Sequence, residues 1–266
     1  RAQNNIPATE ALLRRFVALY PNDLTATCDL ALLLKQIGKL GDAEIHARNA
    51  VRIAPTTSGP HNLMGMILTD ANRPRVGEFH YRRVLELTGR RDPILLANLA
   101  WNLKTQGRIA EARALYEESV AAAPDIMLTW LGWARMEEAD RDFPRAFELL
   151  DRAAALAPDH QGIRLTRAVL HGRQQNYAAA LALLDGLRQP DGAYALGADE
   201  LMEKGRLLDR LGRYDEAFAA YAESKRLVRE ATGQRYLDDA AADQFARLAR
   251  FFTAARMQFT PRASQG

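Results

Sequence analysis

The 266-residue chain has a single cysteine, a small net charge and no long apolar run. Because Cys28 is the only cysteine in the sequence, the chain can form neither an intramolecular disulfide nor a zinc site built from several cysteines. The longest apolar stretch, Tyr177–Leu184, is far too short to cross a bilayer. The 36 basic and 33 acidic side chains leave a charge of +3, which gives no strong attraction to nucleic acid or to an anionic membrane. We therefore expect neither as a partner.

The sequence also lacks the motifs that identify most catalytic and cofactor sites. It has no GxSxG elbow, no P-loop, no GxGxxG loop, no HExxH pair and no calcium-binding loop. None of the five histidines stands at helical metal-ligand spacing from another, although His61 falls on an expected helix that lines a groove. Adjacent carboxylates such as Glu117 and Glu118 point about 100° apart on a helix, which does not suit acid–base chemistry in a shared cleft. We expect no catalytic residue, no metal site and no cofactor in this chain.

Chain-breaking residues recur at a fixed period. Pro21 and Pro55 are 34 residues apart, Pro124 and Pro158 are also 34 apart, and Gly89 stands midway between the two pairs. The sequences around these helix-breaking residues are similar, for example VALYPND and VAAAPDI. Because proline and glycine end helices, these residues separate units of equal length. A repeat of this length indicates a solenoid of stacked units.

Within each unit the pattern predicts two helices joined by a short polar turn. Apolar residues recur at helical spacing, and no segment alternates as a strand would. Small residues on both helices allow the two backbones to approach closely. On the first helices these are Ala31, Gly65, Ala100, Ala134, Ala168 and Gly205. We expect a lone second helix at Ile6–Leu19 and then six hairpins that begin near Leu24, Ser58, Pro93, Met127, Gln161 and Ala198.

Two units carry a family resemblance. Met127–Pro158 has Trp130, Trp133, Ala134 and Ala146, and Ala198–Arg229 has Gly205, Leu208, Gly212, Tyr214, Ala217 and Tyr221. In this arrangement the chain resembles the tetratricopeptide repeat, a helical hairpin of 34 residues. The resemblance implies an all-α, right-handed superhelical solenoid with a C-terminal capping helix. We place the solenoid at residues 1–231, a capping or bridging helix at 232–259 and a linker or tail at 260–266.

The predicted capping helix runs from Tyr236 to Met257, where apolar residues fall at helical spacing. A terminal helix that covers the last hairpin is expected of a solenoid. We therefore predict that Phe245, Leu248 and Phe252 pack on the hairpin Ala198–Arg229.

The resemblance also implies a binding surface. In this family the first helix of each hairpin lines the concave face, and partner peptides lie along it. By register, the peptide-groove residues are Asn62, Met66, Asn98, Trp101, Leu131 and Arg135, and the same register adds Asp29, Leu32, Glu203 and Arg206. An asparagine amide both donates to and accepts from a peptide backbone, and aromatic and arginine side chains dominate binding hot spots. The alternative is that the asparagines are ordinary surface residues and that Trp101 belongs to the core between helices.

A second resemblance covers the C-terminal part of the chain. The segment from Gly212 to Ser264 looks like the junction between the repeats and the catalytic domain of bacterial repeat-containing sulfotransferases. The nucleotide loop of that family typically contains PRSGTT, whereas this chain has PRASQG at Pro261–Gly266. No catalytic residue is therefore carried over. The alternative function is the non-catalytic N-terminal repeat region of a larger sulfotransferase that continues beyond Gly266.

The leading hypothesis is an interaction scaffold that binds a protein or peptide in its groove. A self-assembling solenoid, including a homodimer, stays open as a third alternative. The chain begins with Arg1 and the first helix lacks its partner, so we expect a processed or truncated start and a longer array. A cytoplasmic location is expected, but the truncated start leaves it undetermined.

Overall fold

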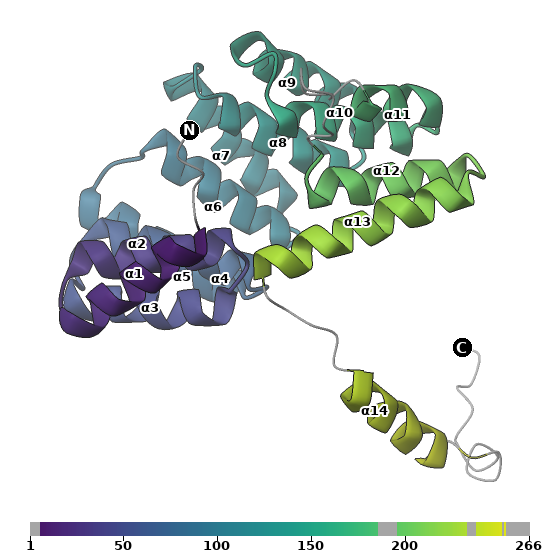
Figure 1. Cartoon of the computed structure of the whole chain (residues 1–266). Coiled ribbons are helices and arrows are strands. Elements are labelled where there is room, and N and C mark those ends of the chain that lie inside the picture. The colour runs from purple at the N-terminus through teal and green to yellow at the C-terminus, as the bar shows by residue number, and fades with distance from the viewer. Residues whose placement is uncertain (1–5, 186–195, 233–237, 252, 254–266) are drawn as a thin grey trace.

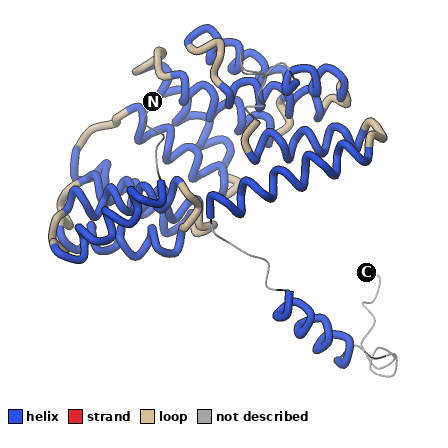
Figure 2. The backbone as a smooth tube through the Cα atoms, viewed as in Figure 1, coloured by secondary structure: helices blue, strands red, loops and turns tan. Residues whose placement is uncertain are grey.

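The computed structural model describes residues 6–185, 196–232, 238–251 and 253. These residues form fourteen helices and no strand (Figure 2). The helices stack as antiparallel hairpins into a curved solenoid (Figure 1). The predicted all-α solenoid of helical hairpins is confirmed.

The hairpins begin where the sequence predicts them. A lone helix, α1 (Ile6–Leu19), precedes them. The first helices are α2 (Leu24–Gln36), α4 (Ser58–Asp70), α6 (Pro93–Thr105), α8 (Met127–Ala139), α10 (Gln161–Arg173) and α12 (Ala198–Arg210). The second helices are α3 (Leu40–Ile53), α5 (Pro74–Thr88), α7 (Ile109–Ala122), α9 (Phe143–Leu156), α11 (Tyr177–Asp185) and α13 (Tyr214–Thr232).

Caps and tight turns define the ends of these helices. The carboxylates of Asp23 and Asp92 accept hydrogen bonds from the backbone amides of Ala26 and Leu95, at 2.8 and 3.0 Å, and so cap α2 and α6. Every turn inside a complete hairpin contains one left-handed residue: Gly38, Asn72, Gly107, Arg141, Gln175 and Gly212. This conformation reverses the chain within a few residues, and glycine adopts it without steric cost.

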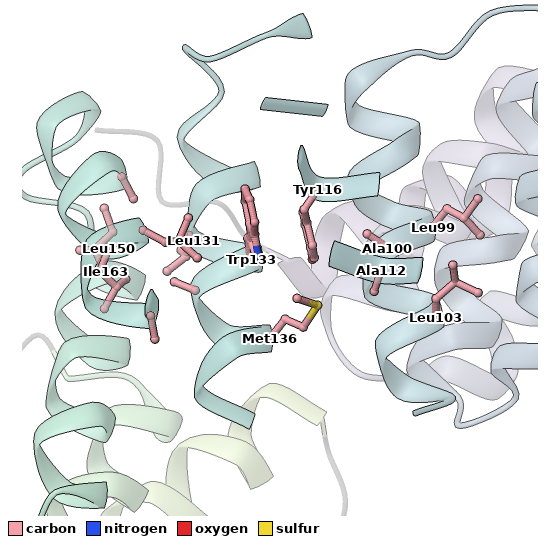
Figure 3. Close-up of a cluster of buried hydrophobic side chains, with 14 of the residues drawn as sticks. Leu99, Ala100, Leu103, Ala112, Tyr116, Leu131, Trp133, Met136, Leu150 and Ile163 are labelled. Atoms are coloured by element: carbon pink, nitrogen blue, oxygen red, sulfur yellow. The ribbon is translucent and has the colours of Figure 1, made fainter. Parts of the chain in front are cut away.

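The central core joins successive hairpins along the solenoid. It extends from Tyr81 of α5 to Leu170 of α10 and includes stacked aromatic rings (Figure 3). The centroids of the Tyr116 and Trp133 rings are 6.0 Å apart, and the two rings are nearly parallel. A separate cluster around Leu30 holds the N-terminal hairpins together. Because each cluster joins side chains of consecutive hairpins, each hairpin depends on its neighbours for stability.

Small residues allow the two helices of one hairpin to meet. A Cβ atom placed on Gly65 of α4 would lie 2.8 Å from Cε1 of Tyr81 on α5. At Gly205 of α12 the corresponding distance, to Cε1 of Tyr221 on α13, would be 2.5 Å. Both distances are shorter than van der Waals contact, so only glycine fits without displacing the tyrosine ring.

Gly65→Ala is therefore expected to destabilise the protein. The overpacking against Tyr81 outweighs the gain in helix propensity, and the net loss is about 1–2 kcal/mol in the free energy of unfolding by urea. Gly59→Ala in the same helix is the control, because a Cβ atom there has no neighbour within 4 Å. The control should be neutral or slightly stabilising. Equal effects of the two substitutions would show that the Gly65–Tyr81 approach does not limit stability.

The last described helix, α14 (Asp238–Phe251), differs from the prediction in its contacts. It lies apart from the solenoid (Figure 1), with Phe245 and Leu248 exposed to 68% and 43%. The predicted packing of these two side chains on α12 and α13 is not present, and Phe252 lies outside the described residues. The assignments of residues 232–259 as a capping or bridging helix and of 260–266 as a tail stay predictions.

Candidate functional site

The concave face of the solenoid is lined by the first helices. Each first helix from α2 to α12 contacts the next first helix, whereas successive second helices make no comparable contact within the part of the chain that the structure describes. The first helices are therefore on the inner side of the curve and the second helices on the outer side. Side chains on adjacent first helices share one continuous surface, as the repeat register predicts.

An open pocket of about 270 Å³ lies between α6 and α8 on this face. We name it the central pocket. Its lining combines apolar side chains with a few polar groups, and it consists of Ile94, Ala97, Asn98, Trp101, Tyr116, Ile126, Leu128, Thr129, Leu131, Gly132 and Arg135. Ile94 and Leu128 are exposed to 54% and 63%, respectively. A concave apolar surface with few polar groups is typical of a ligand site.

Four of the six predicted groove residues line the central pocket, and one of them, Leu131, is only 3% exposed and also belongs to the central core. Asn98 and Trp101 come from α6, and Leu131 and Arg135 come from α8. Trp101 is half-buried in the pocket wall, and the Nζ atom of Lys104 is 4.5 Å from the centroid of its ring. This placement differs from the alternative in which Trp101 belongs to the core between helices.

Arg135 is held in place by the next hairpin. Its Nε atom donates a hydrogen bond of 3.1 Å to the hydroxyl of Thr166 on α10, and that hydroxyl donates to the carbonyl of Gly162 at 2.7 Å. Burial lowers the pKa of Arg135, and the carboxylates of Asp199 and Glu200 act in the opposite direction. An arginine stays protonated despite such a shift, so the pocket contains a positioned cation at its edge.

Gly162 makes room for two of these side chains. A Cβ atom at this position would lie 3.1 Å from Cδ2 of Leu131 and 3.2 Å from Nη2 of Arg135. Sequence analysis missed Gly162, Thr166, Ile94 and Leu128. Their role depends on how neighbouring hairpins pack, which a single repeat unit does not specify.

The other two predicted groove residues lie elsewhere. Asn62 lines a neighbouring pocket between α4 and α6, which shares Ile94 with the central pocket. The Oδ1 atom of Asn62 is buried and has no hydrogen-bond partner among the described residues. Met66 is half-buried and packs against the central core, outside both pockets.

The four positions added by register lie toward the two ends of the concave face. Asp29 and Leu32 are exposed on α2. Glu203 and Arg206 line a third pocket, of about 260 Å³, between α10 and α12. We name it the C-terminal pocket.

His61, which the repeat register placed on a first helix, does not face the groove. It is buried against α5, where its Nδ1 atom lies 3.0 Å from Nδ1 of His80, and its Nε2 atom lies 3.1 Å from the carbonyl oxygen of Pro55. A carbonyl only accepts, so Nε2 of His61 carries the hydrogen. In neutral His61, Nδ1 is then an acceptor, and Nδ1–H of His80 donates to it. Sequence spacing gave no indication of this pair because it joins two helices of one hairpin.

The pair predicts a dependence of stability on pH. Burial first, and the neighbouring His61 second, lower the pKa of His80 from 6.5 to about 4. Between these values the unfolded chain binds a proton that the folded chain does not, so the free energy of unfolding falls as the pH drops from about 6.5 toward 4. His80→Gln removes the titrating group, and urea unfolding should show a weaker dependence on pH in this window. An identical pH dependence in the two proteins would contradict the assignment.

Within the described part of the chain, no three histidine, cysteine or carboxylate side chains come together in a way that would hold a metal ion. Nor is any helix there long and apolar enough to span a membrane.

Comparisons with known families identify the repeats. Residues 97–161 match a family model described as a tetratricopeptide repeat, and residues 201–227 match a second model with the same description. These two segments are therefore similar in sequence to tetratricopeptide repeats, and the stacked hairpins around them have the fold of a tetratricopeptide-repeat solenoid. No curated protein matches the chain significantly.

Solved structures share the fold at low sequence identity. A tetratricopeptide repeat protein from Parabacteroides merdae superposes with a TM-score of 0.67 and 13% identity, over 86% of this chain and 91% of that chain. The protein pilF of Pseudomonas aeruginosa superposes with a TM-score of 0.52 and 21% identity, over 77% of this chain and 91% of that chain. Human IFIT1, solved as a dimer with PPP-AAAA, superposes with a TM-score of 0.66 and 15% identity, over 86% of this chain and 57% of that chain. These similarities establish the fold alone.

Proposed function

We propose that the chain is an interaction scaffold whose concave face binds an extended peptide segment of a partner protein. The observation that carries this proposal is the meeting of Asn98, Trp101, Leu131 and Arg135 in one open pocket. Tetratricopeptide-repeat proteins typically bind proteins or peptides, which supports the same conclusion. The scaffold performs no reaction of its own and needs no cofactor.

The central pocket suits an apolar side chain of the peptide. The exposed side chains of Ile94 and Leu128 stand at its edge, and Trp101 forms part of its wall. Covering these groups removes apolar surface from water, which favours binding by roughly 25 cal/mol for each Å² buried. Trp101 adds a large side chain with few rotamers to lose, as is typical of hot spots.

The two asparagines suit the peptide backbone. Asn98 is in the central pocket, and Asn62 lines the pocket beside it. The side chain of Asn62 is half-buried, and its covered Oδ1 atom accepts no hydrogen bond from the described residues. Rotation of this amide toward the face would let Oδ1 accept a hydrogen bond from an N–H group of a bound peptide. Backbone hydrogen bonds at successive hairpins would hold the peptide extended along the face.

A random 12-residue peptide library displayed on phage tests this proposal. Selection on the immobilised protein should enrich peptides that share a large apolar residue, and these peptides should not bind a protein with Leu128→Asp and Arg135→Glu. Circular dichroism of the double variant controls for folding. If no peptide is enriched, or if every enriched peptide binds the folded double variant equally well, the concave face is not a peptide site.

The predicted sulfotransferase junction stays a hypothesis. Both matching family models describe repeats, and residues 254–266 lie outside the described structure. The sequence encoded after Gly266 in the gene tests it, because a PRSGTT-like loop within a few dozen residues is expected. A homodimer and a cytoplasmic location are likewise predictions, which sedimentation of the protein and localisation of a tagged copy would test.

A further inference from the structure

We propose that the C-terminal pocket recognises carboxylate side chains of the same bound segment, so that the partner peptide has acidic residues on one side of its apolar anchor. This inference rests on the proposed function and specifies the chemistry of the partner. It follows from the charges that the structure places between α10 and α12.

Three guanidinium groups surround the C-terminal pocket. Arg173 belongs to α10, and Arg206 and Arg210 belong to α12. Gly172 lets α10 and α12 approach each other closely, because a Cβ atom there would lie 3.1 Å from Cδ2 of Leu207. All three arginines line the same pocket, so the cations border one accessible hollow instead of being dispersed over the surface.

Two carboxylates inside the protein satisfy these cations only in part. Nε of Arg173 donates to Glu138 at 2.7 Å, and Nη1 of Arg206 donates to Glu203 at 2.8 Å. Arg210 forms no ion pair or side-chain hydrogen bond within the described residues. Each guanidinium has five N–H donors, so most donors here have no partner among these contacts. The three cations and two carboxylates leave one positive charge in excess.

The buried carboxylate fixes the orientation of Arg206. The side chain of Glu203 is only 9% exposed, and it is anchored one helical turn from Arg206. Burial raises the pKa of Glu203, while Arg206 and Arg173 act against this rise. A guanidinium that is already positioned loses less rotational freedom when a ligand carboxylate arrives. The pocket is thus organised for an anion before it binds one.

The other described pockets of the concave face have no comparable group of arginines. Near its N-terminal end, Lys35 is paired with Asp70 at 2.8 Å, and Asp29 adds a negative charge. In the central pocket the only lining cation is Arg135. Three cations line the C-terminal pocket, whereas one lines the central pocket and one lines the pocket at Asn62. This difference orients a ligand whose acidic residues lie beyond its apolar anchor.

A peptide fits these charges better than a nucleic acid does. Tight nucleic-acid binding typically neutralises about six or more phosphates. Here two of three arginines already face carboxylates, and the central pocket on the same face is bordered by aliphatic side chains.

The test uses the phage-selected peptides and two charge-reversal variants. Arg210→Glu changes the cation that has no internal partner, and Arg152→Glu is the matched control on the outer helix α9. We expect the selected peptides to be enriched in Asp and Glu on one side of the apolar residue. Their affinity, measured by fluorescence anisotropy at low salt, should fall at least tenfold with Arg210→Glu and should not change with Arg152→Glu.

The outcomes separate this inference from the proposed function. Peptides that need Leu128 and Arg135 but show no acidic enrichment, or that bind Arg210→Glu unchanged, would overturn the acidic-ligand inference and leave the peptide groove intact. If no peptide is enriched, both conclusions are wrong. A 12-nucleotide oligoadenylate RNA that binds the wild type more tightly than the peptides, and loses affinity with Arg210→Glu, would assign the pocket to nucleic acid instead.

Discussion

Replacing Glu137 with alanine is expected to lower the free energy of unfolding by about 3 kcal/mol. Glu137 is fully buried on α8. Its carboxylate accepts hydrogen bonds from Nε1 of Trp133 at 2.7 Å and from Nε and Nη2 of Arg113 on α7 at 2.8 and 2.6 Å. The substitution leaves the indole N–H without an acceptor in the core and leaves Arg113 with only its contact to Asp140. It therefore breaks a polar link between two successive hairpins.

Urea unfolding measures the effect, and two substitutions calibrate it. Glu137→Gln keeps an acceptor for Trp133 and should cost less, about 1–2 kcal/mol. Glu148→Gln removes an exposed ion pair with Arg145 and should change stability by less than about 1 kcal/mol. If Glu137→Ala were as stable as Glu148→Gln, the buried link would not contribute to the stacking of the hairpins.

Replacing Trp101 with alanine is expected to weaken the binding of a phage-selected peptide about 30-fold, or about 2 kcal/mol. The indole forms part of the wall of the central pocket, and Lys104 lies over its ring. Alanine removes the apolar contact surface and the cation–π contact together. Isothermal titration calorimetry with wild type and variant gives the ratio of dissociation constants directly.

Phe218→Ala is the matched control, because Phe218 is an exposed aromatic residue on the second helix α13, away from the concave face. Its removal should leave the affinity unchanged. A Trp101→Ala protein that folds normally and binds as tightly as the Phe218→Ala protein would show that Trp101 is not an anchor.

The hairpin boundaries were predictable because local chemistry determines them. Pro93 can occupy the first turn of a helix, Asp92 caps the same helix, and Gly107 reverses the chain after it. Such signals lie within a few residues of the boundary they define, and the helix-breaking prolines and glycine between units recur at a fixed period. The helices α2 to α13 therefore follow the sequence pattern closely.

The candidate site was predictable only in part. Register along the first helices placed Asn98, Trp101, Leu131 and Arg135 on one face, because equivalent positions of stacked hairpins point the same way. It did not predict that Met66 faces the core, since a turn of a few tens of degrees about the helix axis moves a side chain from the groove to the interior.

Contacts between distant elements were the least predictable. The pairing of His61 with His80 and the gathering of arginines at the C-terminal pocket depend on helix packing angles. The exposure of Phe245 on α14 shows the same limit, because an amphipathic pattern indicates an apolar face without specifying what covers it.

Photo-crosslinking of a phage-selected peptide tests the peptide groove most directly. Benzoylphenylalanine replaces either Leu128, at the edge of the central pocket, or Ile45, which is equally exposed on the outer helix α3. The account predicts that irradiation joins the peptide to the protein substituted at Leu128 and not to the protein substituted at Ile45. Crosslinking from Ile45 in the absence of crosslinking from Leu128 would contradict it, because the peptide would then occupy the outer face of the solenoid.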